Sequence, residues 1–413
     1  MRDSAHFRKL KISPLIVFST IIFLISLHDG IMSYVSPVIL NSKLQDPFLV
    51  GLILSSSSLF GMFFNFIIAT FYDHKDYRFF IPRMLFFALL FPTIYLILPR
   101  DYIPFVLAMI VWSVYYEFRN YSKYNFVHEF LPPQENTEAW SVMTMFQSAS
   151  YMIGPAIAVF LTTKNLDAPL YASITIVSTA IFLYIIFLKF YAKDKLKTKK
   201  VAKGSFSDVI NQLKTFKILF KKLWALITFN FTLALLDVSF WTVGVLYSEK
   251  LRQTHDFGAL FIIVYGFPAI FVGLVTPHIY QKLGKKRTAF ISGILAGLSL
   301  VAVGFAQNIF LILGSVFLAS AFSGITFILI CATFEDYVTR LDGEENDIVS
   351  MSQFSINLAY AAGPVILGLI ARTYSFGASF ITTGVILVLS AILSMLVVPR
   401  KIRMPRKELA EVN

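Results

Sequence analysis

Long apolar stretches, separated by short polar ones, run along almost the whole chain. A helix of about 18 or more apolar residues can cross a hydrocarbon layer about 30 Å thick. Twelve stretches reach that length, near residues 13–39, 49–71, 79–98, 103–130, 138–163, 168–191, 222–248, 257–280, 287–306, 309–334, 348–371 and 375–398. The pattern therefore predicts an all-α integral membrane protein with twelve transmembrane helices.

A basic segment divides these stretches into six and six. It carries eleven lysines from Lys189 to Lys222. We therefore expect an N-terminal six-helix half at 1–191, a basic linker at 192–221, a C-terminal six-helix half at 222–398 and a basic tail at 399–413. Within 205–222, apolar residues at helical spacing between lysines predict an amphipathic helix on the inner membrane surface; they are Phe206, Val209, Leu213, Phe216 and Phe220.

The distribution of positive charge predicts the topology. The formal net charge is +12, and 28 of the 36 lysines and arginines fall on one side of the predicted membrane, in the two tails, the linker and alternate loops. Loops rich in Lys and Arg stay in the cytoplasm. We expect a multi-pass protein of the plasma membrane with both termini in the cytoplasm, and the charge does not indicate a nucleic-acid partner.

Cysteine and histidine provide no metal chemistry. Cys331 is the only cysteine, and the six histidines have no pair at the spacing of metal ligands. The sequence predicts that the protein has no metal site and no bound cofactor and that it is not an enzyme. The proton is the expected coupling ion.

The two halves repeat one another at a nearly constant offset. Asp29 corresponds to Asp237 at an offset of 208 residues, and Tyr151 corresponds to Tyr360 at an offset of 209. Gly154-Pro155 corresponds to Gly363-Pro364 in the same register. Because six spans return the chain to its starting side, the halves are predicted to be parallel repeats.

Two short loops carry a resemblance to the major facilitator superfamily. The family motif G-x-x-x-D-R-x-G-R-R is similar to ATFYDHKDYR at Ala69–Arg78, and a second copy, PHIYQKLGKK, stands at Pro277–Lys286. Both copies lack several motif residues. The resemblance implies two six-helix halves related by an axis along the membrane normal. It also implies a cytoplasmic gate formed by Asp73, Arg78, Gln281 and Lys286.

The glycine-proline pairs resemble a second motif of this superfamily, found in its antiporter branch. That motif continues with further glycines, whereas Ala158 stands at one of those positions. Gly154-Pro155 and Gly363-Pro364 are therefore interpreted either as part of an antiporter motif or as ordinary helix kinks, which neighbouring helices can tolerate.

Ionisable residues deep in three spans are candidates for proton coupling and solute binding, because such residues are costly in a membrane and are kept away from lipid. These candidates and their polar neighbours are His28, Asp29, Glu117, Arg119, Asn120, Lys123, Asp237 and Trp241. The resemblance implies that spans 1, 4, 7 and 10 line a central cavity, so Asp29 is expected to contact Arg119 or Lys123. Glu117 lies about 160° around the helix from Arg119 and serves other neighbours. The family motif of the fourth span begins with an arginine, and the end of that motif resembles Glu129-Phe130-Leu131-Pro132-Pro133. Counting back from there along the family spacing lands near Met109, so Arg119 is not the arginine of the family motif.

Several alternatives stay open at this stage. His28 is either a proton relay or a donor that holds Asp29, and the charges of the fourth span either serve transport or form a structural ion-pair network. Weaker candidates for the cavity are Tyr34, Gln147, Asn230, Asn357 and Tyr360.

The function predicted from these features is secondary transport of a small solute by alternating access, coupled to protons. Export of a drug or metabolite in exchange for protons is slightly favoured. The alternative is import of a sugar, carboxylate or small peptide together with protons. A membrane-embedded enzyme or a non-transporting scaffold fits less well, because neither explains the duplication. The expected partners are a small molecule and the lipid bilayer, and the protein is expected to be a monomer.

Overall fold

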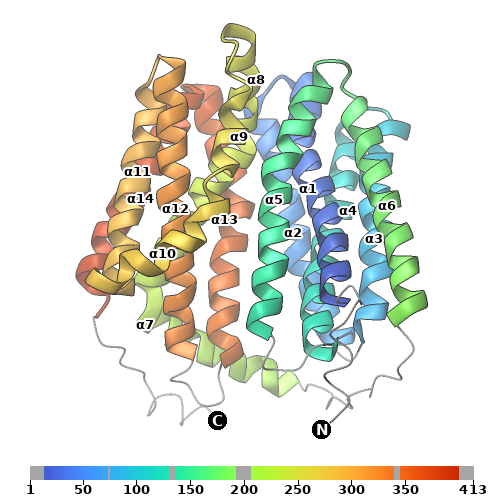
Figure 1. Ribbon diagram of the computed structural model, residues 1–413. Helices are drawn as coiled ribbons and strands as arrows, with labels where there is room; N and C mark the ends of the chain where they lie inside the picture. The colour runs from blue at the N-terminus through green and yellow to red at the C-terminus, as the bar shows by residue number, and fades with distance from the viewer. Residues whose placement is uncertain (1–13, 73–74, 131–135, 192–205, 339–344, 400–413) are drawn as a thin grey trace. The chain divides into compact units, whose positions relative to one another are not determined.

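The computed structural model describes residues 14–72, 75–130, 136–191, 206–338 and 345–399, which are helical almost throughout and contain no strand (Figure 1). Packing divides the chain into two compact units. Unit 1 contains Met1–Val35 and Phe64–Val201, and unit 2 contains Ser36–Phe63 and Ala202–Asn413. The segment Ser36–Phe63 thus groups with unit 2, where Asp46 forms an ion pair with Arg372 at 3.1 Å. The boundaries of the sequence repeat stay a prediction.

The six spans predicted before the linker are all helices. They are α1 (Pro14–Leu44), α2 (Pro47–Phe71), α3 (Tyr77–Ile97), α4 (Tyr102–Phe130), α5 (Asn136–Thr162) and α6 (Ala168–Tyr191). The hydrophobic pattern therefore placed these helices to within a few residues. Asp76 caps the N-terminus of α3, where its carboxylate accepts a hydrogen bond from the backbone N–H of Phe79 at 3.2 Å.

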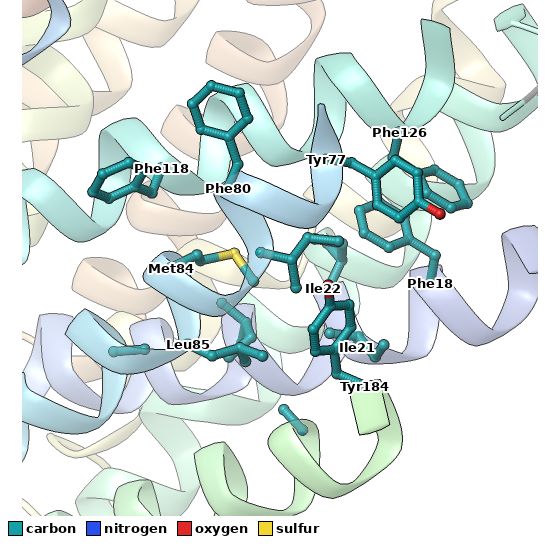
Figure 2. Close-up of a cluster of buried hydrophobic side chains, with 14 of the residues drawn as sticks. Phe18, Ile21, Ile22, Tyr77, Phe80, Met84, Leu85, Phe118, Phe126 and Tyr184 are labelled. Carbon is teal, nitrogen blue, oxygen red and sulfur yellow. The ribbon is translucent and has the colours of Figure 1, made fainter. Parts of the chain in front are cut away.

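An aromatic core joins α1, α3, α4 and α6 in unit 1 (Figure 2). Phe18 of α1 stacks on Phe126 of α4 with ring centroids 3.8 Å apart. Tyr77 of α3 meets Phe126 edge to face at 5.9 Å. These rings are fully buried and fix the position of α4 against α1.

The first helix of the C-terminal half is longer than predicted. The sequence predicts the amphipathic segment and the span at 222–248 as separate elements, but α7 runs without interruption over Phe206–Ser239. The reason is that no proline or glycine interrupts the chain between 206 and 239. A single π-helical turn follows at Phe240–Gly244, and α8 (Val245–Thr254) completes this span.

The predicted span at 257–280 is wrong as one helix. It is split into α9 (Leu260–Gly266) and α10 (Ala269–Leu283). Pro268 lies at the break and has no backbone N–H with which to continue the hydrogen-bond ladder. The last four spans are confirmed as α11 (Lys285–Phe305), α12 (Ile309–Val338), α13 (Glu345–Thr373) and α14 (Phe376–Val397).

Ten of the helices in the described ranges are long and apolar enough to cross a membrane. Helix α4 is not among them, although it has 29 residues. Its interior contains Glu117, Arg119 and Lys123, which lower its hydropathy. The chain is thus a multi-pass membrane protein whose most polar helix lies among apolar ones.

Candidate functional site

Asp29 of α1 lies at the centre of a hydrogen-bonded cluster in unit 1. Its carboxylate is fully buried. Oδ1 accepts a hydrogen bond from Trp112 Nε1 at 3.1 Å. Oδ2 accepts hydrogen bonds from the Tyr116 hydroxyl and from Arg119 Nη1, both at 2.7 Å. The hydroxyl of Tyr151 also donates to Oδ2. Four donors therefore surround one carboxylate, and one of them is a cation.

The spacing of residues on α4 produces three of these four donors. Trp112, Tyr116 and Arg119 stand four and three residues apart, which places them on one face of the helix. The guanidinium carbon of Arg119 lies 4.3 Å from the centre of the Tyr116 ring, a cation–π arrangement. This face of α4 is turned toward Asp29.

A close approach of α1 and α5 provides the fourth donor. A Cβ built on Gly154 would lie 2.9 Å from the carbonyl carbon of Gly30, closer than real side chains come. Only glycine at position 154 therefore permits this distance between the helices. The close approach brings Tyr151, one turn earlier on α5, to Asp29, which precedes Gly30. Helix α5 continues through Pro155. The pair Gly154-Pro155 thus serves helix packing next to Asp29.

Lys123 lies one turn beyond Arg119 on the same side of α4. Its Nζ donates to Gln147 Oε1 of α5 at 3.3 Å, and no carboxylate among the described residues pairs with it. Glu117 is buried, with 8% of its surface exposed, and forms no ion pair with Arg119 or Lys123. Of the two cations expected beside Asp29, Arg119 is in contact with it, and Glu117 lies outside this ion pair as expected.

Asp237 of α7 lies at the centre of a second cluster, in unit 2. Oδ1 accepts a hydrogen bond from the Tyr265 hydroxyl of α9 at 2.5 Å. Oδ2 accepts one from the Tyr360 hydroxyl of α13. Trp241, in the π-helical turn, also hydrogen-bonds this carboxylate. Single π turns occur frequently at functional sites, and here the turn begins three residues after Asp237.

The two clusters share one pair and differ in charge. Each aspartate accepts a hydrogen bond from the tyrosine three residues before the glycine-proline pair, Tyr151 or Tyr360. In unit 1 a guanidinium also contacts the carboxylate. Within the described parts of unit 2, no lysine, arginine or histidine forms an ion pair with Asp237. The duplication therefore preserved the Asp–Tyr pair but not its cation.

His28 does not hold Asp29, so that alternative is wrong. Its Nδ1 is hydrogen-bonded to Ser173 Oγ of α6 at 2.5 Å, and its Nε2 has no hydrogen-bond partner in the described part of the chain. Successive residues on an α-helix point about 100° apart. His28 therefore faces α6 while Asp29 faces α4 and α5.

Four of the weaker or neighbouring candidates lie outside the two clusters. Asn230 donates to Ser355 Oγ at 2.7 Å and to the Ser352 carbonyl at 3.2 Å, which ties α7 to α13. Tyr34 is fully buried in α1. Asn120 and Asn357 are half-buried and do not hydrogen-bond Asp29 or Asp237. Gln147 does join the first cluster, through Lys123.

Three of the predicted gate residues lie at helix termini: Arg78 at the start of α3, Gln281 at the end of α10 and Lys286 at the start of α11. Asp73 is outside the described residues. Arg78 donates through Nε to the Tyr77 hydroxyl at 3.3 Å. Gln281 is exposed. Lys286 donates to the Pro399 carbonyl at 2.9 Å, while its neighbour Lys285 pairs with Asp336 at 2.8 Å. The ion pair at this position is therefore formed by Lys285, one residue before the predicted lysine.

Four cluster residues were missed by the sequence reading of the site. For Tyr151 the signal was available, because its repeat partner Tyr360 was a candidate. Trp112 and Tyr116 could have been found from their spacing to Arg119. Tyr265 has no repeat counterpart, since position 57 is Ser57, and nothing in the sequence singles it out.

Comparison with known proteins decides the family. The model of the Major Facilitator Superfamily matches residues 17–288 and again residues 231–411. The chain belongs to the major facilitator superfamily. The resemblance seen in the gate loops is thereby confirmed, and the chain is a membrane transporter rather than an enzyme. No curated protein shows significant similarity to it.

Solved transporters of this superfamily share the fold over nearly the whole chain. A variant of the nucleoside transporter NupG is 12% identical with a TM-score of 0.75, covering 94% of this chain and 100% of the other. A bacterial homolog of the human lysosomal transporter Spinster is 13% identical, with a TM-score of 0.70 and coverage of 97% and 98%. The xylose transporter XylE from E. coli is 12% identical, with a TM-score of 0.66 and coverage of 94% and 100%. At these identities the similarity shows the fold alone.

Proposed function

We propose that this protein is a proton-coupled secondary transporter of a small solute, working by alternating access, and that Asp237 carries the coupling proton. The observation that supports this proposal most strongly is the set of groups around Asp237. Two phenols and an indole donate to its carboxylate, and no cation among the described residues pairs with it.

The two aspartates differ in what balances their negative charge. A charge inside a membrane protein is costly unless a partner neutralises it. Arg119 neutralises Asp29 at 2.7 Å. For Asp237, the group that can neutralise the charge is a proton, because tyrosine and tryptophan donate hydrogen bonds without bringing a positive charge. The residue Asp237 is not fully enclosed by the protein, which supports access by protons.

Joint loading of proton and solute is favoured over exchange. In an exchanger, the proton and the solute commonly compete for one group. Here the carboxylate proposed to bind the proton, Asp237, belongs to unit 2, whereas Lys123 and Gln147, which are candidates for solute binding, belong to unit 1. This division between different groups supports proton–solute symport. Exchange stays the second candidate, supported by the partial glycine-proline motif at Gly154-Pro155. The plasma membrane is the proposed location, and the charge distribution supports an orientation with both termini in the cytoplasm.

Reconstitution tests this proposal. Proteoliposomes that contain a pH-sensitive dye are exposed to pools of sugars, carboxylates, small peptides and drugs. With the wild-type protein, an active pool moves protons across the membrane, inward with the solute for symport and against it for exchange. Asp237→Asn should abolish the proton movement while solute exchange down its own gradient continues. Undiminished proton movement by this variant would remove Asp237 from the coupling step.

A further inference from the structure

Lys123 is a cation in the interior of unit 1. No anionic side chain among the described residues forms an ion pair with it. Its ammonium group has three donor hydrogens. The described structure provides one acceptor, the neutral amide oxygen of Gln147, at 3.3 Å. The residue is partly exposed, so a second molecule can approach it.

Arg119 has a donor to spare on the same face of α4. Its Nη1 contacts Asp29, Tyr115 and Tyr151. Its Nε is buried and has no hydrogen-bond partner within the described ranges, although only 5% of the residue is exposed. A buried N–H of a guanidinium is nearly always paired in a native protein. The absence of a partner for Nε of Arg119 within the described ranges therefore points, independently of Lys123, to an acceptor from outside the chain.

Lys123 has no carboxylate of its own in this cluster. The charged groups that act on Lys123 are Arg119 and Asp29. The carboxylate of Asp29 is already engaged by Arg119. Arg119 and Lys123 stand four residues apart, where Cβ atoms are about 5–6 Å apart and like charges repel. Glu117 acts on Arg119 through space but forms no ion pair with either cation. A negative charge beside Lys123 would therefore be stabilised by the ammonium group.

From these observations we infer that Lys123 and Arg119 bind the transported solute through a negatively charged head group, a carboxylate or a phosphate. An anion between the two side chains accepts from the ammonium of Lys123 and from Nε of Arg119, and it leaves the Asp29–Arg119 pair intact. Hydrogen bonds between charged groups are stronger than neutral ones. The inference rests on the proposed function and specifies the class of its solute as a small organic anion.

Asp29 has a positioning role in this arrangement. Together with Trp112, Tyr116 and Tyr151, it fixes the orientation of the guanidinium. Neutral or cationic solutes would leave Lys123 uncompensated, and a cationic drug would be repelled. The selectivity therefore lies in unit 1, whereas the coupling proton binds Asp237 of unit 2.

Thermal unfolding of the purified full-length protein tests this inference, and it does not require the solute to be identified. The probes are acetate, lactate, succinate and inorganic phosphate, each beside a neutral counterpart: acetamide, lactamide, succinamide and glycerol. A ligand that binds only the folded state raises the Tm in proportion to the logarithm of its concentration above its Kd. Anions should raise the Tm, and their neutral counterparts should not. The carboxylate and phosphate arms identify the head group.

Three variants connect the shift to Lys123. Lys123→Gln should weaken anion binding by about tenfold or more, since a charged hydrogen bond is lost. Lys123→Arg should retain most of the binding. Lys164→Gln removes the same charge from an exposed position just beyond α5, where Lys164 contacts the Phe160 ring, and should bind as the wild type does. The Tm of each variant without ligand shows that it is folded.

Three results would overturn the inference: no shift with any of the anions, equal shifts with the neutral counterparts, or a full shift in Lys123→Gln. A parallel series with added phosphatidylglycerol separates a free anion from a lipid head group, and stabilisation by the lipid alone would also overturn it. Failure here leaves proton coupling through Asp237 unaffected, because that step is measured separately by proton movement.

Discussion

The hydroxyl of Tyr360 in α13 donates a hydrogen bond to the carboxylate of Asp237 in α7. The hydroxyl of Tyr151 in α5 donates in the same way to Asp29 in α1. These pairs are related by the sequence repeat, but the positions that correspond to Arg119 in the second half are Phe327 and Ile328. One copy of the pair is therefore neutralised by a guanidinium and the other is not.

Removal of either member of the Asp29–Arg119 pair should destabilise the protein. Both side chains are almost fully buried. An uncompensated buried charge typically costs about 3–5 kcal/mol. We expect Asp29→Asn and Arg119→Gln each to lower the Tm strongly, and the double variant to be less unstable than the sum of the two. The measurement is thermal unfolding in detergent, evaluated as a double-mutant cycle. Strictly additive losses would contradict the pairing.

Two repeat-related glycines should respond differently to alanine. A Cβ at Gly154 would meet the backbone of Gly30 at 2.9 Å, whereas a Cβ at Gly363 would meet the side-chain atom Cγ1 of Val238 at 2.8 Å. Overpacking typically costs about 1–3 kcal/mol. Gly154→Ala should fall at the upper end of this range, since backbone cannot rotate away, and Gly363→Ala at the lower end.

The Gly363 contact offers its own control. Because Val238 provides the obstructing atom, Val238→Ala should restore part of the stability lost in Gly363→Ala. No substitution at Gly30 can restore Gly154→Ala in this way, since Gly30 already lacks a side chain. Equal losses at the two glycines, measured by thermal unfolding, would show that the two helix crossings are alike.

Asn230 should matter for stability and not for coupling. Its amide joins α7 to Ser352 and Ser355 of α13, and 1% of the residue is exposed. Asn230→Leu removes these bonds, each of which contributes about 0.5–1.5 kcal/mol, while the Ser355 hydroxyl still donates to the Ser352 carbonyl. We expect a lower Tm with an unchanged ratio of protons to solute in proteoliposomes. A changed ratio would place Asn230 in the transport site.

The hydrophobic pattern predicted the helices well, because a span of apolar residues has few alternatives in a bilayer. It failed at the break before Pro268, where one residue without an N–H splits a long apolar run, and at α7, where a basic segment continues directly into the membrane. Both errors concern the joining of helices rather than their existence.

The site was predictable in part. The depth of Asp29, together with the resemblance that places spans 1 and 4 at one cavity, predicted a contact with Arg119 or Lys123, and the repeat identified Asp237. Tyr265 is an ordinary aromatic residue in an apolar helix, and its role depends on which helices pack together. Of the two roles left open for His28, the donor to Asp29 is not found, since adjacency in sequence does not mean adjacency on a helix face.

Infrared difference spectroscopy of the purified protein in lipid tests the central claim most directly, because protonated carboxyl groups have a separate C=O stretching band. The account predicts such a band that appears as the pH is lowered, disappears in Asp237→Asn and persists in Asp29→Asn. A band that persists in Asp237→Asn but disappears in Asp29→Asn would contradict the account and transfer the coupling proton to the first unit.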